Sequence, residues 1–334
     1  MQKYVPSEVS DVLLHLKEEN NINNGLPINI TMKYSSVILN NEIHIFGNTD
    51  HYKLDSLLGI WVKVSTLPYK FSGSCAVVLN NEIHILGGYY ATTSHYKYNS
   101  STNTWSSVST LPRTFQGNAA VISNGAINIF IGTHRYSYKP SEGYWVEQVS
   151  NPLSVYTAVV SDGWDIYMLN SSNIYYFRYN GSDWYDYGSL PFDFSYGDAV
   201  ITFGDYTYID ILGGNSSTST FHYKRIANSS SASWSEISTL PISFYCDAIS
   251  LGSYIYLMQD KKFYKYNGSW TNVYGDITDN VVLPYTRYDN VFNRPRVVYD
   301  TSSMNNGAPF NLLALQEEEM TEAEINDLYN KVRM

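Results

Sequence analysis

Cysteine is scarce in this chain: Cys75 and Cys246 are the two cysteines among 334 residues, too few for a disulfide scaffold. Charged residues make up 16% of the chain, against the ~25% that is usual in soluble domains. Positive charge is the scarcer sign, and the formal net charge is −10. This balance argues against non-specific binding to nucleic acid or to an anionic membrane, because both need a basic face.

Long apolar runs are lacking as well. No stretch approaches the ~18 consecutive apolar residues that a transmembrane helix needs, so we expect no membrane insertion. The first residues, MQKYVPSEVSDVLLHL, do not contain the apolar core of a secretory signal. We therefore expect synthesis in the cytosol without a signal peptide, and reduced thiols.

Aromatic and uncharged polar residues take the place of charge. Aromatics are 16% of the chain, Tyr alone accounts for 32 residues, and a count along the sequence gives 31 Asn. Aromatic side chains pack well on pleated sheets, and Asn and Gly form tight turns. The composition therefore predicts short strands joined by turns, and it excludes a disordered chain.

A repeat of about 40 residues fills the middle of the chain. The segment LNNEIHI occurs at Leu39–Ile45 and again at Leu79–Ile85. Five of six regularly spaced tryptophans are followed seven residues later by proline, and four of those prolines are followed three residues later by phenylalanine. The six tryptophans are Trp61, Trp105, Trp145, Trp184, Trp234 and Trp270.

Each repeat is predicted to form four strands. In the second repeat these are CAVVL, then EIHIL after an Asn80-Asn81 turn, then HYKYN, and finally a strand that contains Trp105 and ends before Pro112. A single four-stranded sheet cannot bury both of its faces. Six such sheets packed around an axis would bury them against one another.

This order of strands, with Gly-Gly after the second strand and Trp before Pro, resembles the kelch repeat, whose units form the blades of β-propellers. The resemblance covers residues 32–284, although the glycine pair is intact only at Gly87-Gly88 and Gly213-Gly214. It implies an all-β fold, a kelch-type β-propeller of six four-stranded blades. The expected blades are residues 32–71, 72–115, 116–153, 154–194, 195–244 and 245–284.

The two ends differ from the repeats. Residues 1–31 are expected to form an N-terminal helical extension, and residues 285–310 a connecting or closing segment. Residues 311–334 are acidic. They contain a capping-box pair, Thr321 and Glu324, so a C-terminal helix is expected there. Its apolar stripe either packs on the propeller or docks on a partner protein or a second copy of the chain, and we expect docking. The docking residues would be Ile325, Leu328, Tyr329 and Val332.

The histidines and cysteines do not suggest a metal centre. His44 and His84 occupy one repeat position, and His51, His95 and His222 occupy another, so they are spread around the ring and are expected to be structural. Some kelch-like enzymes are copper oxidases with a cysteine–tyrosine cross-link, but the sequence offers no convergent histidine pair to accompany the neighbouring Tyr245 and Cys246. No nucleophile, zinc or phosphate-binding motif is present. We expect no catalytic residues, metal or cofactor.

In kelch propellers the connections after the second and fourth strands gather at one face. Tyr, Asn, Ser and a few cationic residues dominate these connections here, which is typical of an adaptable recognition surface. The function expected is a non-catalytic recognition or assembly module that binds a protein or a glycan and is attached to a larger assembly, such as a bacteriophage virion or tail. The alternative is a sugar-processing enzyme of the kelch-like mutarotase or oxidase type. The candidate binding residues are Tyr69, Lys70, Tyr89, Tyr90, Arg113, His134, Arg135, Phe192, Asp193, Asn215, Tyr245, Tyr285 and Arg287.

Overall fold

The structure of this chain consists of repeated antiparallel sheets. It is a computed structural model that describes residues 26–27, 36–55, 60–90, 93–115, 119–154, 157–170, 175–179, 183–229, 231–243, 247–273, 285–289 and 294–298. All regular structure in these ranges is β-strand, which confirms the all-β class. No helix in them is long and apolar enough to cross a membrane. The chain divides into two compact units, one of residues 28–271 and one of residues 1–27 together with 272–334.

The sheets follow one another along the chain. The first has three strands, β1 (Ser36–Leu39), β2 (Glu42–Asp55) and β3 (Ile60–Phe71). The second and third have four each: β4 (Cys75–Leu79), β5 (Glu82–Leu86), β6 (His95–Asn99), β7 (Thr104–Ser107); and β8 (Ala120–Ser123), β9 (Ala126–Ile131), β10 (His134–Lys139), β11 (Tyr144–Glu147).

Three more four-stranded sheets complete the series. They are β12 (Ala158–Ser161), β13 (Ile166–Leu169), β14 (Tyr175–Tyr179), β15 (Trp184–Ser189); β16 (Tyr196–Phe203), β17 (Thr207–Gly214), β18 (Phe221–Ile226), β19 (Ser235–Thr239); and β20 (Asp247–Leu251), β21 (Tyr254–Gln259), β22 (Lys262–Tyr266), β23 (Trp270–Asn272). Residues 36–272 thus form five four-stranded sheets and one three-stranded sheet, where six four-stranded blades were expected.

Asparagine pairs make the tight turns that the sequence predicts. Asn80 and Asn81 have φ of 51° and 62°, and the pairing of Leu79 with Glu82 leaves them as a two-residue hairpin loop. Asn40 and Asn41 form the same loop in the first sheet. Two successive positive φ angles are the geometry of a type I′ turn, whose twist matches that of the flanking strands.

Strand β2 covers the positions that two strands occupy in the next sheet. Its two halves lie against each other, because His44 contacts His51 and Glu42 pairs with Lys53, the same contacts that join β5 to β6 through His84–His95 and Glu82–Lys97. Asn48, at φ 53°, lies between the halves. The second sheet has two separate strands here, β5 and β6, whereas β2 of the first sheet is continuous. The first sheet therefore has three strands and the second has four.

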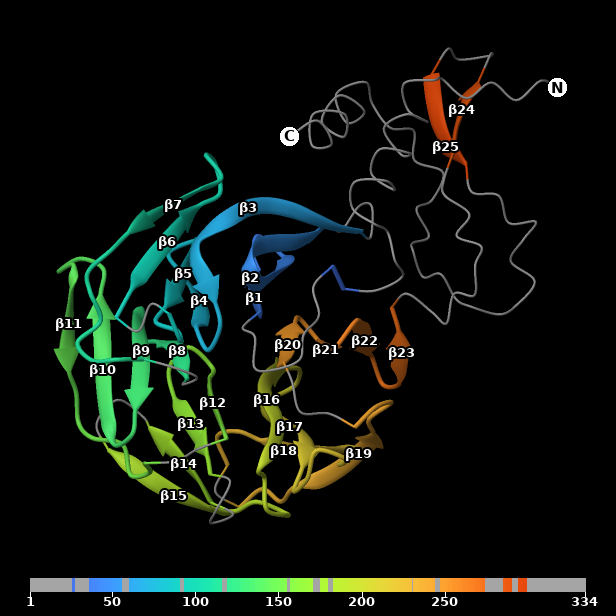
Figure 1. Ribbon diagram of the computed structural model, residues 1–334. Helices are drawn as coiled ribbons and strands as arrows, with labels where there is room; N and C mark the ends of the chain where they lie inside the picture. Colours follow the sequence, from blue (N-terminus) through green and yellow to red (C-terminus); the bar gives the residue numbers. More distant parts are fainter. Residues whose placement is uncertain are drawn as a thin grey trace. The chain divides into compact units, whose positions relative to one another are not determined.

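The sheets of residues 36–272 surround an axis (Figure 1). The first strands of neighbouring sheets touch in succession, from β1 to β4, β8, β12, β16 and β20, and β20 touches β1 again. Apolar side chains fill the space between neighbours: Phe46 of the first sheet packs with Ile83 and Ile85 of the second. Burying one such side chain contributes about 1.5–3 kcal/mol. The arrangement confirms a β-propeller.

The repeated tryptophans lie between sheets. Trp105 contacts His51 of the preceding sheet with ring centroids 5.6 Å apart, and Trp61 of the first sheet contacts Phe263 of the last at the same separation. Trp61 is buried, and the other five are half-buried. The prediction that these residues pack between blades is confirmed for Trp105 and Trp61. Of the six tryptophans, only Trp61 is fully buried.

The second unit contains one described hairpin, in which β24 (Tyr285–Asp289) pairs antiparallel with β25 (Arg294–Val298). This hairpin lies within the expected connecting segment of residues 285–310. The expected terminal helices lie outside the described residues, as do the docking residues Ile325, Leu328, Tyr329 and Val332.

Candidate functional site

Connections from different sheets meet at one face of the propeller. The N–H of Gly88, after β5, donates to the carbonyl of Phe115 at 2.7 Å, and the N–H of Tyr89 donates to the carbonyl of Ser72 at 2.6 Å. Ser195 and Gly214 are joined in the same way between the fourth and fifth sheets. We call the surface formed by residues 69–74, 87–90, 112–115, 191–195 and 214–220 the loop face.

The glycine pair fixes the loop that follows β5. Gly87 has φ +58°, and a Cβ there would lie 2.2 Å from the carbonyl oxygen of Phe115. Gly88 has φ +116°, and its Cβ would lie 2.2 Å from Ser74 Oγ, which itself donates to the carbonyl of Gly87. A side chain at either position would collide with a neighbouring connection. The loop is therefore held between the connections that precede and follow its own sheet.

Two tyrosines leave this fixed loop and face solvent. Tyr89 is 61% exposed and Tyr90 is 66% exposed, and their ring centroids lie 5.3 Å apart at an angle of 65°. The ammonium of Lys70, near the end of β3, lies 5.6 Å from the Tyr90 ring centroid. We call Tyr89, Tyr90 and Lys70 the tyrosine patch.

Arg113 lies in the connection on the other side of the patch. Its Nε donates to the Tyr136 hydroxyl at 2.6 Å, and that hydroxyl donates to Glu147 at 3.3 Å. His134 Nδ1 lies 2.9 Å from the same carboxylate. The hydrogen bond with His134 is the main cause of a lowered Glu147 pKa, and Tyr136 and Arg113 act in the same direction. The sequence had singled out Arg113 and His134, but Tyr136 and Glu147, which connect them, were missed.

Aromatic residues also gather between the fourth and fifth sheets. Phe192 is half-buried and contacts Phe221 at 4.9 Å and Tyr223 at 5.3 Å between ring centroids. Asp193 and Asn215 are exposed and accept hydrogen bonds from Ser195 and Ser219 of their own connections. These three predicted residues share the loop face with the tyrosine patch.

Other predicted binding residues lie elsewhere. Tyr69 is half-buried against Tyr96, and burial raises the pKa of its hydroxyl. Arg135 is 4% exposed, in the repeat position of His51 and His95, so its guanidinium does not face a ligand. The remaining three fall outside what the structure describes of this face: Tyr245 is not among the described residues, and Tyr285 and Arg287 lie on β24 of the other unit.

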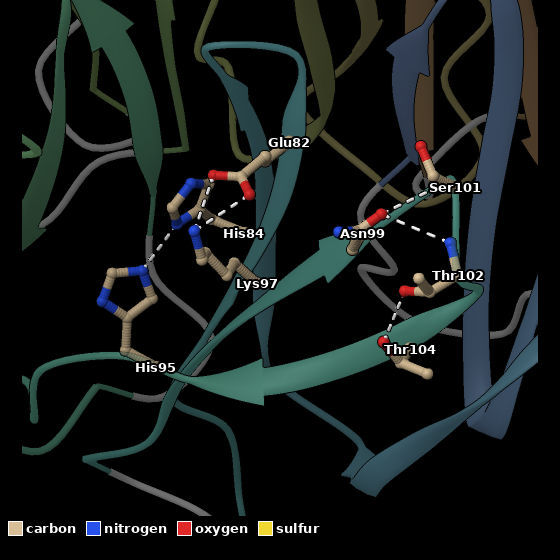
Figure 2. A network of polar contacts seen from close by, with 8 residues as sticks. All are labelled: Glu82, His84, His95, Lys97, Asn99, Ser101, Thr102 and Thr104. Carbon is tan, nitrogen blue, oxygen red and sulfur yellow. Dashed lines mark hydrogen bonds and ion pairs between the residues drawn. The ribbon is translucent and has the colours of Figure 1, made fainter.

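The histidines at repeated positions form pairs inside the sheets. His44 Nδ1 lies 2.8 Å from His51 Nε2, and His84 Nδ1 lies 2.8 Å from His95 Nε2 (Figure 2). Burial lowers the pKa of His44 and of His84 to about 4, and that of His95 to about 3. These imidazoles are buried within the sheets and are neutral at pH 7.

The fifth sheet has a carboxylate where the first has a histidine. Asp210 Oδ1 lies 2.9 Å from His222 Nε2, and His222 Nδ1 lies 2.9 Å from Ser238 Oγ. This order matches a Ser-His-Asp triad, but Trp270 Nε1 donates to Ser238 Oγ at 3.0 Å, and His222 and Asp210 are 0% and 1% exposed. The group therefore holds two sheets together.

The same relay occurs between the first two sheets. His51 Nδ1 contacts Ser65 Oγ, which accepts a hydrogen bond from Trp105 Nε1 of the next sheet. Ser65 and Ser238 both stand four residues after a repeat tryptophan, and Ser109 occupies the third such position. Sequence reasoning missed these serines, although the W-x3-S spacing was available to find them.

The metal and thiol predictions concern residues inside the blades. Cys75 is a half-buried free cysteine, and Cys246 lies outside the described residues. In the ranges that the structure describes, no three His, Cys, Asp or Glu side chains are grouped so that they could hold a metal ion. The loop face thus presents tyrosines and cations, and the buried histidines belong to the packing of the sheets.

Residues 70–112, from the end of β3 through the second sheet, match the family model of the Kelch motif. Among solved structures, the chain is similar to the structure of YjhT, with a TM-score of 0.61 and 15% identity over 74% of this chain and 98% of that chain. It is also similar to a streptogramin B lyase, with a TM-score of 0.53 and 13% identity over 82% of this chain and 93% of that chain. No curated protein matches the chain. The motif and the shared fold support a kelch-repeat propeller.

Proposed function

We propose that this chain is a non-catalytic recognition module that binds a protein or a glycan through its loop face. The observation that carries the proposal is the display of Tyr89 and Tyr90, two exposed aromatic side chains on a backbone fixed by Gly87 and Gly88. Tyrosine offers a large contact area at a low cost in conformational entropy, and a fixed loop loses little further entropy on binding. Kelch propellers are generally interaction modules, which agrees with this surface.

We also propose that the three-stranded sheet serves as a sixth blade and closes the ring. Strand β2 repeats the His–His and Glu–Lys contacts of the second sheet, and Trp61 packs on Phe263 of the last sheet. An experimental structure at side-chain resolution tests this blade count. A seventh sheet inserted between β20 and β1 would contradict it.

The attachment role rests on the two ends of the chain. We propose that residues 1–31 and 311–334 connect the propeller to a larger assembly, such as a virion or phage tail, or to a second copy of the chain. The apolar stripe of the acidic C-terminal segment supports this proposal, because a short helix needs a surface on which to pack.

Ligand selection with matched surface variants tests the recognition role. The full chain is screened against a yeast-displayed library of random peptides and against a glycan array, and the affinity of each ligand is then measured for Tyr90→Ser and Tyr206→Ser. Tyr206 is 58% exposed on the turn between β16 and β17, so it is a control of similar exposure. We expect a loss of about tenfold or more for Tyr90→Ser only, as for a central interface aromatic. Ligands that bind both variants equally would refute recognition at this face.

A sugar-processing enzyme is the second candidate, and the Glu147–His134 pair favours it. Both side chains are partly exposed, at 57% and 38%, so they could exchange protons with a bound sugar. Anomer exchange of a panel of reducing sugars, followed by NMR with the wild-type chain and Glu147→Gln, tests this role. A rate above buffer that Glu147→Gln abolishes would replace the non-catalytic proposal.

A further inference from the structure

One cationic residue lies on each side of the tyrosine patch, in a chain whose net charge is −10. Tyr89 and Gly88 are hydrogen-bonded to Ser72 on one side and to Phe115 on the other. Lys70 stands two residues before Ser72, and Arg113 stands two residues before Phe115. The two exposed tyrosines are therefore flanked by one cation on each side.

The charge of Lys70 is not neutralised within the described part of the chain. Lys53 and Lys97 each bond to a glutamate of their own sheet, Glu42 and Glu82, at 2.9 Å. Lys70, by contrast, contacts only the Tyr90 ring among the described residues, and its side chain is exposed. It is available to an anion that approaches the tyrosines.

Arg113 keeps most of its donors free as well. Its hydrogen bond to the Tyr136 hydroxyl uses Nε, and its terminal nitrogens have no partner in the described ranges. That bond holds the guanidinium at the edge of the loop face. The two terminal nitrogens can then hold a carboxylate with two parallel hydrogen bonds. The neighbouring carboxylate, Glu147, is hydrogen-bonded to His134 and to Tyr136, and it also interacts electrostatically with Arg113.

The shape of the patch favours a protein over a small sugar. Small-molecule sites are concave and enclose most of their ligand, whereas Tyr89 and Tyr90 project from their loop with about two thirds of their surface exposed. The rings are inclined at 65°, so they do not form a flat platform, and Lys70 already lies over one face of Tyr90. Projecting tyrosine with arginine beside it is typical of protein–protein interfaces.

We propose that the tyrosine patch and Arg113 bind an acidic segment of a protein partner, with Tyr89 and Tyr90 in contact with its apolar atoms and Lys70 and Arg113 paired with its carboxylates. This inference rests on the proposed recognition function and names the class of its ligand. The negative charge of the rest of the chain repels the same partner elsewhere, so it directs the segment to this patch.

The test uses peptides selected from the random library on the full chain, with the affinities of synthetic copies measured by fluorescence anisotropy. We expect Asp and Glu to be enriched over the unselected library, and replacement of these residues by Asn and Gln to weaken binding about tenfold. Lys70→Glu should have a similar effect. Lys139→Glu is the control, because it changes the charge equally on an exposed strand end next to the turn between β10 and β11.

The possible results separate this inference from the proposed function. Peptides that need Tyr90 but show no acidic enrichment and bind Lys70→Glu normally would overturn the acidic-partner inference and leave recognition standing. Peptides that are insensitive to Tyr90→Ser would overturn both. Uronate or sulfated glycans that bind in a Lys70-dependent manner, without any acidic peptide, would overturn the assignment of a protein partner.

Discussion

Trp270 Nε1 donates a hydrogen bond to Ser238 Oγ of the preceding sheet, over 3.0 Å. Trp105 and Ser65 make the same contact between the first and second sheets, over 2.9 Å. In both cases the serine also contacts a buried histidine of its own sheet. The relay therefore joins polar groups on both sides of a boundary that is otherwise packed with apolar side chains.

Removing the serine hydroxyl should weaken this boundary. Ser65→Ala leaves the indole N–H of Trp105 and a ring nitrogen of His51 without their partner, and we expect a loss of about 1–3 kcal/mol in the free energy of unfolding. Ser109→Ala is the matched control, because Ser109 Oγ is buried and has no hydrogen-bond partner among the residues that the structure describes. Urea unfolding of both variants measures the difference. An equal effect of the two substitutions would show that the relay contributes nothing.

Truncating the tryptophan should cost more than truncating the serine. Trp105→Ala removes the contacts of the indole with His51, Phe46 and Tyr98, and a loss of about 3–5 kcal/mol is usual for a buried aromatic. Since Trp105 is half-buried, we expect the lower end of that range and a clearly lower melting temperature. Thermal unfolding followed by circular dichroism is the measurement. A normal melting temperature combined with lost ligand binding would reverse the structural assignment of this residue.

Acid should destabilise the first and second sheets through their histidine pairs. The pKa of His44 and of His84 is about 4 in the folded chain, because burial disfavours the charged imidazole, against 6.5 as the ordinary value. Below pH 6.5 the unfolded chain therefore binds more protons, so the free energy of unfolding falls as the pH decreases towards 4. Urea unfolding between pH 7.5 and 4 should show this loss.

The fifth sheet provides a variant that tests the cause. His44→Asp copies Asp210, which occupies the same register position and pairs with His222. The new carboxylate would face His51, Lys53 and the nearby Glu42, and it would favour a protonated His51. Hydrogen exchange should then show residues 36–71 protected to lower pH than in the wild type, with the unchanged His84–His95 pair as an internal control. Identical protection in the two proteins would contradict the histidine explanation.

The glycine pair should control the display of the tyrosines. In Gly88→Ala the added Cβ would lie 2.2 Å from Ser74 Oγ at φ +116°, so the loop must move and ligand binding at Tyr89 and Tyr90 should be lost. Gly143→Ala is the control, since it has a positive φ of 73° but no atom within 4 Å of the added Cβ. It should cost about 1 kcal/mol from backbone strain alone. Affinity for the selected peptides and the melting temperature, measured together, separate the two effects.

Removing the acidic C-terminal segment should leave the propeller folded. Deletion of residues 311–334 takes away the predicted stripe of Ile325, Leu328 and Val332, which lies outside the repeats. We expect a nearly unchanged melting temperature and loss of incorporation into the larger assembly, or of self-association measured by light scattering. A truncated chain that unfolds, or that assembles normally, would show that the segment belongs to the propeller.

Repetition made the fold predictable from sequence. The spacing of Trp, Pro and Phe, the Asn80-Asn81 turn and the shared histidine positions each led to a feature that the structure contains. The number of strands in the first sheet was less accessible, because continuation of β2 through Asn48 depends on backbone geometry that Gly47-Asn48 in the sequence does not determine. Arg135 was placed at the surface for a similar reason: a single arginine in a histidine position carries no sign of its burial.

The loop face could be predicted only in outline. The resemblance to kelch repeats indicated Tyr89, Tyr90 and Lys70 as loop residues. Their arrangement depends on hydrogen bonds between connections that are separated in the sequence, such as Tyr89 with Ser72. The link from Arg113 through Tyr136 to Glu147 likewise joins two sheets. Such contacts between repeats leave no local pattern.

The first and second sheets share LNNEIHI, a histidine pair and a Glu–Lys pair, so part of the surface that each offers to its neighbours is alike. Nearly identical neighbours can compete for one docking place while a repeat protein folds. The second sheet could dock where the first belongs and leave the last sheet without a partner. The third, fourth, fifth and sixth sheets carry Asn128, Tyr167, Asp210 and Tyr256 at the register position of these histidines, so this similarity is confined to the first two sheets. Correct closure of the ring therefore depends on the order in which the sheets associate as well as on the strength of the finished contacts.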